Sequence, residues 1–210
     1  MVTSGSSLAS RLSASLGAVF LLSPLAACVR DPLTGDCPDI EAGELVITEV
    51  SLGDAGSPHG WLEVFNATDR TLDLATLRVT MTPLTGDLDK IRAFIVRETD
   101  LELAAGAYAV FGQGDPRFYD FIDYDFVDDQ GSALEASATY ELHACAVMVD
   151  SATVRALEFD TSLALGGPPD AATNDDSKSG WCTDATVHQS APDKQSTHGS
   201  PGEANPQCPA

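Results

Sequence analysis

"ITEVSLGDAGSPHGWLEVFN", residues Ile47–Asn66, is the stretch that decides the fold. Two short apolar runs flank a loop of Gly, Pro, Ser and Asp, which is the pattern of two strands joined by a turn. Each run contains one glutamate, Glu49 in the first and Glu63 in the second. Alternate side chains of a strand point to opposite faces, so Leu62 and Val64 share one face and Glu63 lies on the other. We therefore expect Leu62 and Val64 in the core and Glu63 pointing outward.

Similar runs continue along the chain and are separated by turn-forming segments rich in Gly, Pro, Asn and Asp. They are Leu45–Val50, Trp61–Phe65, Thr76–Met81, Ile91–Val96, Tyr108–Gly112, Asp123–Val127, Thr139–Ala144, Ala146–Asp150 and Thr153–Phe159. Short strands at such intervals predict an all-β sandwich, which we place at residues 44–206. Its core is expected within 44–160. Residues 161–206 have loop composition, and only Trp181–Val187 is expected to pack.

The N-terminus has the pattern of an export signal. Arg11 is the only charged residue before Cys28, and a mostly apolar stretch from Leu12 to Ala27 is too short and interrupted for a comfortable transmembrane helix. The stretch ends in "LAAC", Leu25–Cys28, which resembles the lipobox of bacterial lipoproteins. That resemblance implies a signal peptide over residues 1–27, a diacylglyceryl group on the sulfur of Cys28, and a tether over residues 28–43. The alternative is an ordinary signal peptide followed by a disulfide cysteine.

The net charge and the residue after the lipobox indicate the partners and the cellular location of the protein. The chain has 11 Lys and Arg against 32 Asp and Glu, a net charge of −21, so its surface repels nucleic-acid phosphates. We expect no nucleic-acid partner. A chain with a lipid-modified N-terminus would be held at a membrane by its acyl groups despite this charge. Val29 stands where an aspartate usually marks inner-membrane retention, which favours the outer membrane of the cell envelope.

Five cysteines are present, and lipidation of Cys28 leaves an even set of four. Four cysteines in an exported chain suggest two disulfides, for which three pairings exist. We expect Cys145–Cys182 to pin the tail to a late hairpin and Cys37–Cys208 to close the two ends of the domain.

Several segments, taken in order, resemble the lamin tail domain family as found in bacteria. They are "GELVITEV", "WLEVFNATDRTLDLATLRVT", "LELAAGAYAVFG", "ATYELHACAVMVDSATV" and "STHGSPGEANP". The family patterns are I-x-E-V, W-I-E-L-Y-N, D-L-S-G-W, L-x-P-G-x-Y-x-V, V-D-S-V and a closing G-T/S-P-G-x-x-N. The resemblance covers residues 44–206 and implies an immunoglobulin-like β-sandwich. This sequence departs from the pattern at "DLATLRV", which lacks the glycine and the tryptophan, and at Ala105, which replaces a proline.

Two acidic groups are candidate sites. Glu49 and Glu63 could face each other as an acid–base pair, but no partner group or pocket is evident, so a structural or surface role is favoured. Asp123 and Asp125 begin like a D-x-D calcium loop, with Asp128 nearby, but Val127 stands where a third ligand belongs and no glutamate completes the spacing. We interpret them as solvated aspartates on an edge strand, with calcium as a weak alternative.

Motifs of common enzyme classes, such as G-x-S-x-G and H-E-x-x-H, are absent from the sequence, and its four histidines lack metal-site spacing. We therefore expect no catalytic residue, no cofactor and a non-enzymatic binding or structural module. Its expected contact surfaces are the loops Ser51–Gly60 and Gly112–Phe118, and its expected partner is a cell-surface protein or polysaccharide. The alternatives are a calcium-dependent adhesion module and an accessory domain of a secreted hydrolase system.

Overall fold

The computed structural model of the chain describes residues 36–56, 59–114, 117–127, 134–174, 180–189 and 194–209. The predictions for the signal peptide, for Cys28 and for Asp128 lie outside these residues. Within them, the structure contains no helix that is both long and apolar enough to cross a membrane.

Two sheets form the body of the domain. The larger sheet has the order β12 (Trp181–Asp184), β11 (Ser162–Leu165), β1 (Leu45–Ser51), β2 (Trp61–Asn66), β7 (Tyr108–Gly112), β8 (Tyr124–Asp125). The smaller sheet has the order β10 (Val147–Val154), β9 (Ala138–Ala144), β4 (Arg78–Pro83), β5 (Arg92–Ile95). Two further strand pairs are β3 (Leu72–Asp73) with β6 (Glu102–Leu103), and β13 (Val187–His188) with β14 (Thr197–His198); a single 3-10 turn, η1 (Leu88–Lys90), follows β4. All of these pairings are antiparallel except β7 with β8.

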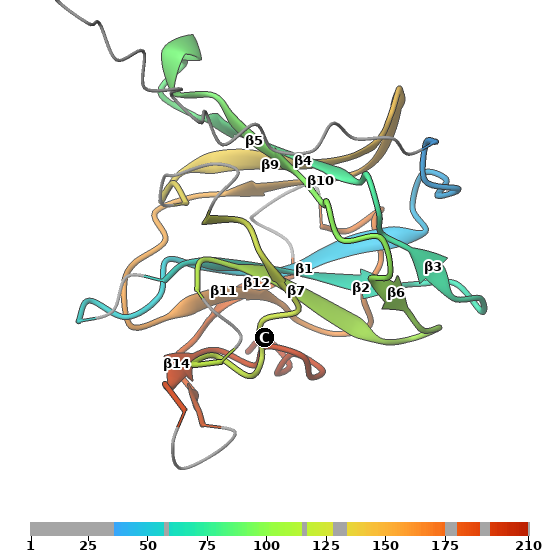
Figure 1. Cartoon of the computed structure of the whole chain (residues 1–210). Helices are drawn as coiled ribbons and strands as arrows, with labels where there is room; N and C mark the ends of the chain where they lie inside the picture. The colour runs from blue at the N-terminus through green and yellow to red at the C-terminus, as the bar shows by residue number, and fades with distance from the viewer. Residues whose placement is uncertain are drawn as a thin grey trace, which may run out of the picture. The chain divides into compact units, whose positions relative to one another are not determined.

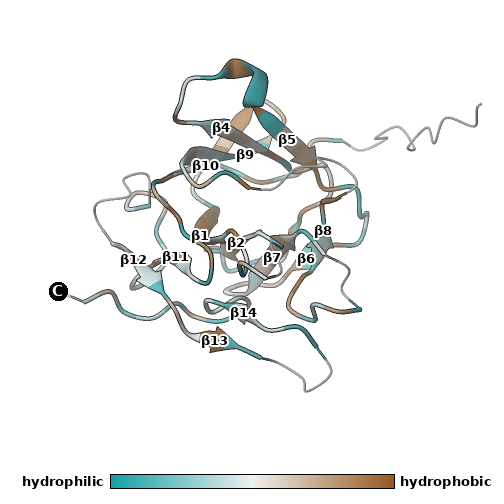
Figure 2. Ribbon diagram, turned by 90° about the vertical axis from the view of Figure 1, so that its left-hand side faces the viewer, coloured by the Kyte–Doolittle hydropathy of each residue, from teal (hydrophilic) through white to brown (hydrophobic). Residues whose placement is uncertain are grey.

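The two sheets lie in layers with the main hydrophobic core between them (Figures 1 and 2). Leu62 and Val64 of β2 are fully buried in this core, as predicted, and β4 contributes Val79 and Met81 from the opposite layer. Each large apolar side chain buried in this way contributes roughly 1.5–3 kcal/mol to folding. The prediction of an all-β fold built from stacked sheets is confirmed.

Tyr140 of β9 is fully buried between the layers. Its hydroxyl donates to the backbone carbonyl of Glu135 at 2.9 Å, so the one polar atom of the side chain has a partner. Burial raises the pKa of the Tyr140 hydroxyl above its usual value, which keeps it neutral and able to donate.

The late strands differ from the prediction. Ala146–Asp150 and Thr153–Phe159 were expected as two strands, but one strand, β10, runs from Val147 to Val154 with a register shift between Met148 and Asp150. The residues after Val154 leave the smaller sheet and cross to β11. β11 pairs with β1, and β12 pairs with β11, so residues after 160 complete the larger sheet. β12 begins at Trp181, in the segment that was expected to pack.

The disulfide pairing inferred from the sequence is wrong. The bonds are Cys37–Cys145 and Cys182–Cys208, with Cα atoms 5.6 and 5.5 Å apart. Cys145 lies in the turn between β9 and β10 of the smaller sheet, beside the segment that leads into β1. Cys182 lies in β12 at the edge of the larger sheet, opposite Ala164 of β11, so it belongs to the other layer. The chain end returns along that edge and brings Cys208 to Cys182.

Candidate functional site

Glu49 and Glu63 are direct partners across the β1–β2 pair and are both fully buried. A register shift between Ile47 and Glu49 leaves Thr48 as an extra residue in β1, in the manner of a β-bulge. The bulge brings Glu49 opposite Glu63, on the face of the larger sheet that points away from the core. Two carboxylates that face each other would normally repel, so the surrounding hydrogen bonds decide whether the pair is tolerated.

The C-terminal strap, residues 197–205, covers this face of the sheet; β13 and β14 lie on the same side, below the larger sheet in Figure 2. The Ser200 backbone N–H donates to Glu49 Oε1 at 3.2 Å, and the Ser200 hydroxyl donates to Glu49 Oε2, also at 3.2 Å. The Ser162 hydroxyl donates to Glu49 Oε1 as well. The carboxylate of Glu49 is therefore enclosed by hydroxyl and backbone donors.

Glu63 is held by two donors, one on each oxygen. The Thr48 hydroxyl bonds to Oε1 at 2.7 Å, and the Gly202 backbone N–H donates to Oε2 at 2.7 Å. Asn205 completes the strap, because its side-chain amide donates to the Thr48 carbonyl at 2.8 Å. The strap therefore binds both glutamates and the bulge between them.

Burial changes the protonation of the pair. Loss of hydration raises the pKa of Glu49 to about 7, although the Ser162 and Ser200 hydrogen bonds oppose the shift. The pKa of Glu63 is raised well above its ordinary value, first by desolvation and then by repulsion from Glu49. Burial and the repulsion from Glu49 both favour the protonated, neutral form of Glu63. In that form its Oε1 hydroxyl can donate to Thr48 across the same 2.7 Å contact, because a hydroxyl can also accept.

The prediction that Glu63 points outward to solvent is wrong, because the strap seals the outer face of β2. Trp61 lies on the same face, is fully buried, and donates its indole N–H to the Thr197 hydroxyl at 3.1 Å. A fully buried carboxylate has no contact with solvent or substrate, so the pair acts as a structural element that fastens the strap. The strap contains the closing "GSPGEAN" segment, whose composition suggests an exposed loop and not a cover over buried carboxylates.

Asn174 lies in the stretch 161–206, where only Trp181–Val187 was expected to pack, and that expectation is wrong for Asn174. Its side chain is fully buried and donates to Asp150 Oδ2 at 2.6 Å and to the Ile47 carbonyl at 3.0 Å. Asp150 Oδ2 also accepts the Ile47 backbone N–H at 2.6 Å, next to the bulge in β1. These contacts join the segment before β12 to both sheets.

The weak calcium candidates bind backbone groups in this structure. Asp123 Oδ2 accepts the Val110 N–H at 2.8 Å. Asp125 Oδ1 accepts the Val127 N–H at 2.9 Å and the Gly114 N–H at 3.3 Å. Both aspartates therefore hold the turns around β8.

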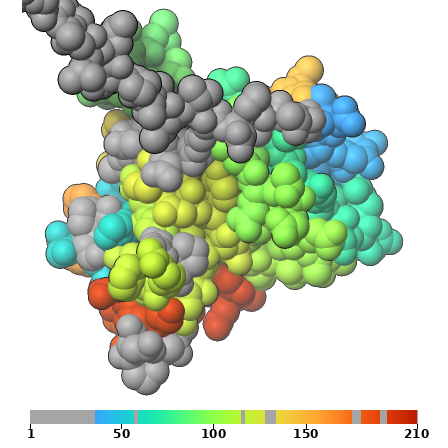
Figure 3. Space-filling model, in the orientation of Figure 1, coloured from blue at the N-terminus to red at the C-terminus, as the bar shows by residue number. Residues whose placement is uncertain are grey.

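One end of the sandwich, which we call the loop end, gathers four connections. They are the described parts of 51–60, 112–123, 155–161 and 185–198. β1, β7 and β12 finish at this end of the larger sheet, and β2 and β11 begin there, because these strands are paired antiparallel. Both loops predicted as contact surfaces belong to it. The β13–β14 region meets the segment after β7, because the Gln195 N–H donates to the Phe118 carbonyl at 3.0 Å (Figure 3).

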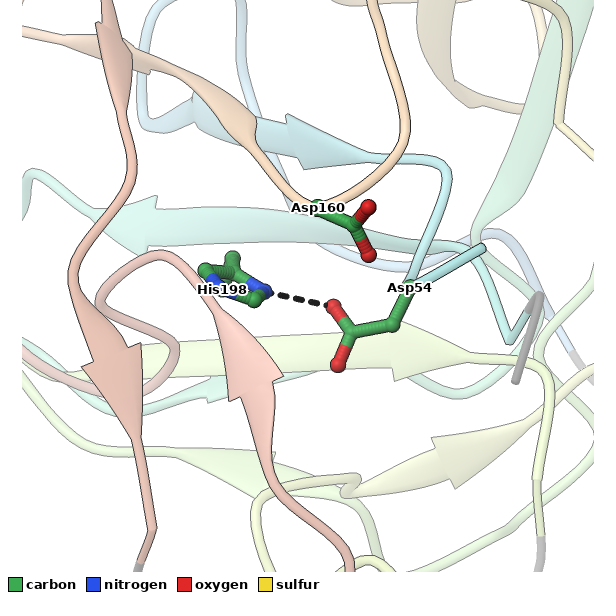
Figure 4. Close-up of side chains that lie close together, drawn as sticks. All are labelled: Asp54, Asp160 and His198. Atoms are coloured by element: carbon green, nitrogen blue, oxygen red, sulfur yellow. Dashed lines mark hydrogen bonds and ion pairs between the residues drawn. The ribbon is translucent and has the colours of Figure 1, made fainter. Parts of the chain in front are cut away.

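Three side chains converge at the loop end from three of these connections: Asp54, Asp160 and His198 (Figure 4). One ligand atom from each lies within 4.8 Å of the other two. His198 Nδ1 and Asp54 Oδ1 are 2.7 Å apart, and Asp160 Oδ1 accepts the Ala55 N–H at 2.9 Å. Sequence reasoning did not find this group, because the histidine and Asp54 are 144 positions apart.

The chain matches no protein-family model, no curated protein and no solved structure.

Proposed function

We propose that this chain is an exported β-sandwich of the lamin tail type, anchored by a lipid on Cys28 in the bacterial cell envelope, at the outer membrane. It acts as a non-enzymatic binding module whose loop end contacts a cell-surface protein or polysaccharide. It has no nucleic-acid partner, since its net charge is −21.

The immunoglobulin-like type is supported by strand order. β1-β2-β7 in one sheet and β10-β9-β4-β5 in the other correspond to the orders A-B-E and G-F-C-C′ of that fold. Tyr140 near the start of β9 donates to a carbonyl five residues upstream, as a tyrosine corner on strand F does. Strand order and the tyrosine corner can be recognised from the structure without any similarity in sequence.

The lamin-tail resemblance is supported at the positions where this sequence departs from the family pattern. Thr76 stands where the pattern D-L-S-G-W has glycine, and its φ is +66°, a conformation that favours glycine. Gly106, in the L-x-P-G pattern, has a φ of +70°. The closing G-S-P-G-x-x-N segment supplies the strap contacts of Ser200, Gly202 and Asn205.

The loop end carries the functional part of the proposal. Three large apolar side chains are exposed on its connections: Phe118 at 56 %, Phe159 at 48 % and Val187 at 60 %. Exposed apolar side chains on the loops of a rigid scaffold are available for contact with a partner. By contrast, the buried pair Glu49 and Glu63 is sealed beneath the strap.

Cys37, where the described chain enters the domain, and the loop end lie at opposite ends of β1. Cys37 is bonded to Cys145 in the β9–β10 turn, at the end where β1 begins, whereas the loop end is where β1 finishes. Cys28 is nine residues before Cys37, a reach of at most about 30 Å. A lipid on Cys28 would therefore be connected to the end of the domain that lies opposite the loop end.

The anchor is tested by Cys28→Ala. We expect the parent chain to remain in washed membranes and the variant to be found in the soluble fraction, because the variant has no sulfur to acylate. Fractionation and mass spectrometry of the N-terminus measure both properties. Val29→Ala, which keeps the cysteine, is the control and should fractionate like the parent. A Cys28→Ala chain that stays in washed membranes contradicts the lipid anchor.

The contact surface is tested with the soluble Cys28→Ala protein. We expect the purified protein, added back to envelope fragments of the producing bacterium, to sediment with them before any wash, through contacts that washing releases. The additional changes Phe118→Asp, Phe159→Asp and Val187→Asp together should weaken this binding about tenfold or more, since they charge the exposed apolar positions.

The matched control changes Val147 and Met148 to Asp in the β9–β10 hairpin, at the opposite end of the domain. These side chains are exposed to similar extents, 45 and 53 %. The control should bind like the parent. Equal loss in both variants would show that charge alone, and not the loop end, determines retention.

A further inference from the structure

We propose that Asp54, Asp160 and His198 bind one divalent transition-metal ion, of the Zn²⁺ or Mn²⁺ class, at the loop end. The site does not depend on the lipid anchor or on the partner of the module. It would join the β1–β2 loop, the β10–β11 connection and strand β14, which are distant in sequence.

The geometry of the three donors is close to that of a metal site. One ligand atom from each residue lies within 4.8 Å of the others, and the side chains point toward one another (Figure 4). Metal–ligand bonds of about 2.0–2.2 Å in a tetrahedral site place neighbouring donors roughly 3.3 Å apart. Closing the remaining gap takes rotations of side chains that are not packed in the core. The side chains of His198 and Asp54 are 24 and 21 % exposed, and Asp160 is exposed.

The backbone fixes the positions of the donors. The Asp160 N–H donates to the Gly53 carbonyl at 3.2 Å, and Asp160 Oδ1 accepts the Ala55 N–H at 2.9 Å. These two bonds clamp Asp160 onto the loop that carries Asp54. His198 lies in β14, where it pairs with Val187. The ligands are therefore preorganised by strands and loop contacts, which reduces the entropy lost when an ion binds.

The charges favour a cation. Two carboxylates converge on one imidazole, and in the described part of the chain His198 is the only basic side chain paired with either of them. A neutral imidazole leaves a charge of −2 at the site, and a protonated one leaves −1. A divalent ion would bind Nδ1 in its unprotonated form and balance both carboxylates.

The donor set indicates which ion fits. Imidazole nitrogen suits zinc and other transition metals, carboxylate oxygen suits manganese as well, and calcium is typically bound by oxygen alone. One nitrogen and two carboxylates thus favour a transition metal over calcium. Three protein ligands also leave at least one position of the ion open. At the loop end, that position could take an oxygen from a partner.

Metal titration of the full chain, with oxidised disulfides and no histidine tag, tests the site. We expect one Zn²⁺ or Mn²⁺ per chain by isothermal titration calorimetry. At about 100-fold excess over the dissociation constant, the melting temperature should rise by roughly 5–10 °C, because the ion binds only the folded state. Ca²⁺ at the same concentration should produce no comparable shift.

Two variants and one control assign the ligands. His198→Ala and Asp160→Asn should each lower the affinity at least tenfold. Asp160→Asn keeps an oxygen for the Ala55 N–H, so it should fold like the parent. His143→Ala is the matched control, because His143 pairs with a single carboxylate, Glu141, at 3.3 Å on β9. Absence of binding, binding of Ca²⁺ alone, or equal loss in the His143 variant would overturn the site.

Discussion

Replacing Gly199 with alanine should lower the free energy of unfolding by about 3–5 kcal/mol. A Cβ at this position would lie 2.5 Å from Glu49 Oε1, 2.7 Å from the Ser162 hydroxyl oxygen and 2.9 Å from Trp61 Cζ2. All three groups are buried and cannot move aside, and overpacking of this kind costs roughly 1–3 kcal/mol. The φ of Gly199 is +117°, which adds about 1–3 kcal/mol of backbone strain for alanine. Urea denaturation followed by tryptophan fluorescence measures the loss.

Gly202→Ala is the matched control in the same strap. Its φ is +79°, but a Cβ there meets nothing within 4 Å, so only the backbone cost of about 1 kcal/mol is expected. Trp61 contacts the strap directly and reports on its release, while Trp181 reports on β12. Equal losses in the two variants would mean that the strap does not pack closely against the glutamate pair.

Stability should decrease as pH rises from about 5 to 8. The pKa of Glu49 is raised from 4.5 to about 7 by burial, so the folded state holds a proton that the unfolded state releases between these values. The stabilisation is fully present below pH 4.5 and is lost as pH rises through about 7. The shift of Glu49 corresponds to about 3 kcal/mol, and the raised pKa of Glu63 adds a loss of the same sign. Denaturation at fixed ionic strength across this range measures the slope.

The chain has a net charge of −21, and its self-repulsion also lowers stability as pH rises. The variant Glu63→Gln distinguishes the contribution of the buried pair to the pH dependence from the contribution of this net charge. The glutamine amide can donate to the Thr48 hydroxyl while its carbonyl accepts the Gly202 N–H, so the strap contacts are kept. This variant should lose less stability than the parent as pH rises above 4.5, because in the parent unfolded Glu63 releases a proton that the folded state retains. Glu203→Gln, at an exposed position of the strap, should follow the parent curve. Parallel curves for Glu63→Gln and the parent would show that folding does not raise the pKa of Glu63.

Both predictions concern the same contact between a carboxylate pair and the strap. If Gly199→Ala releases the strap, water reaches Glu49 and its pKa should return toward 4.5. The part of the pH dependence that comes from burial should then disappear in this variant. The two experiments therefore check each other.

The local pattern of the sequence determined the strands. Alternation in "WLEVF" identified Leu62 and Val64 as core residues, because side-chain direction in a strand has period two whatever lies above it. The same rule placed Glu63 on the opposite face, which is also where it lies. The sequence around Glu63 does not indicate which segment covers that face. Composition likewise predicted the all-β class, since it depends on short-range propensity and turn chemistry.

The tertiary structure alone decided which distant segments meet. The strap covers Glu49 and Glu63 because its backbone N–H groups reach them, and such donors belong to any loop sequence. The disulfides followed the layers: Cys145 and Cys182 lie in different sheets, a separation that cysteine counting does not contain. Asp54, Asp160 and His198 meet because the three connections that carry them lie at the same end of the larger sheet. A sequence pattern reports the periodicity of neighbouring residues. The burial of a charge and the meeting of metal ligands depend instead on contacts between residues that are far apart in the chain, such as Asp54 and His198, which are 144 positions apart.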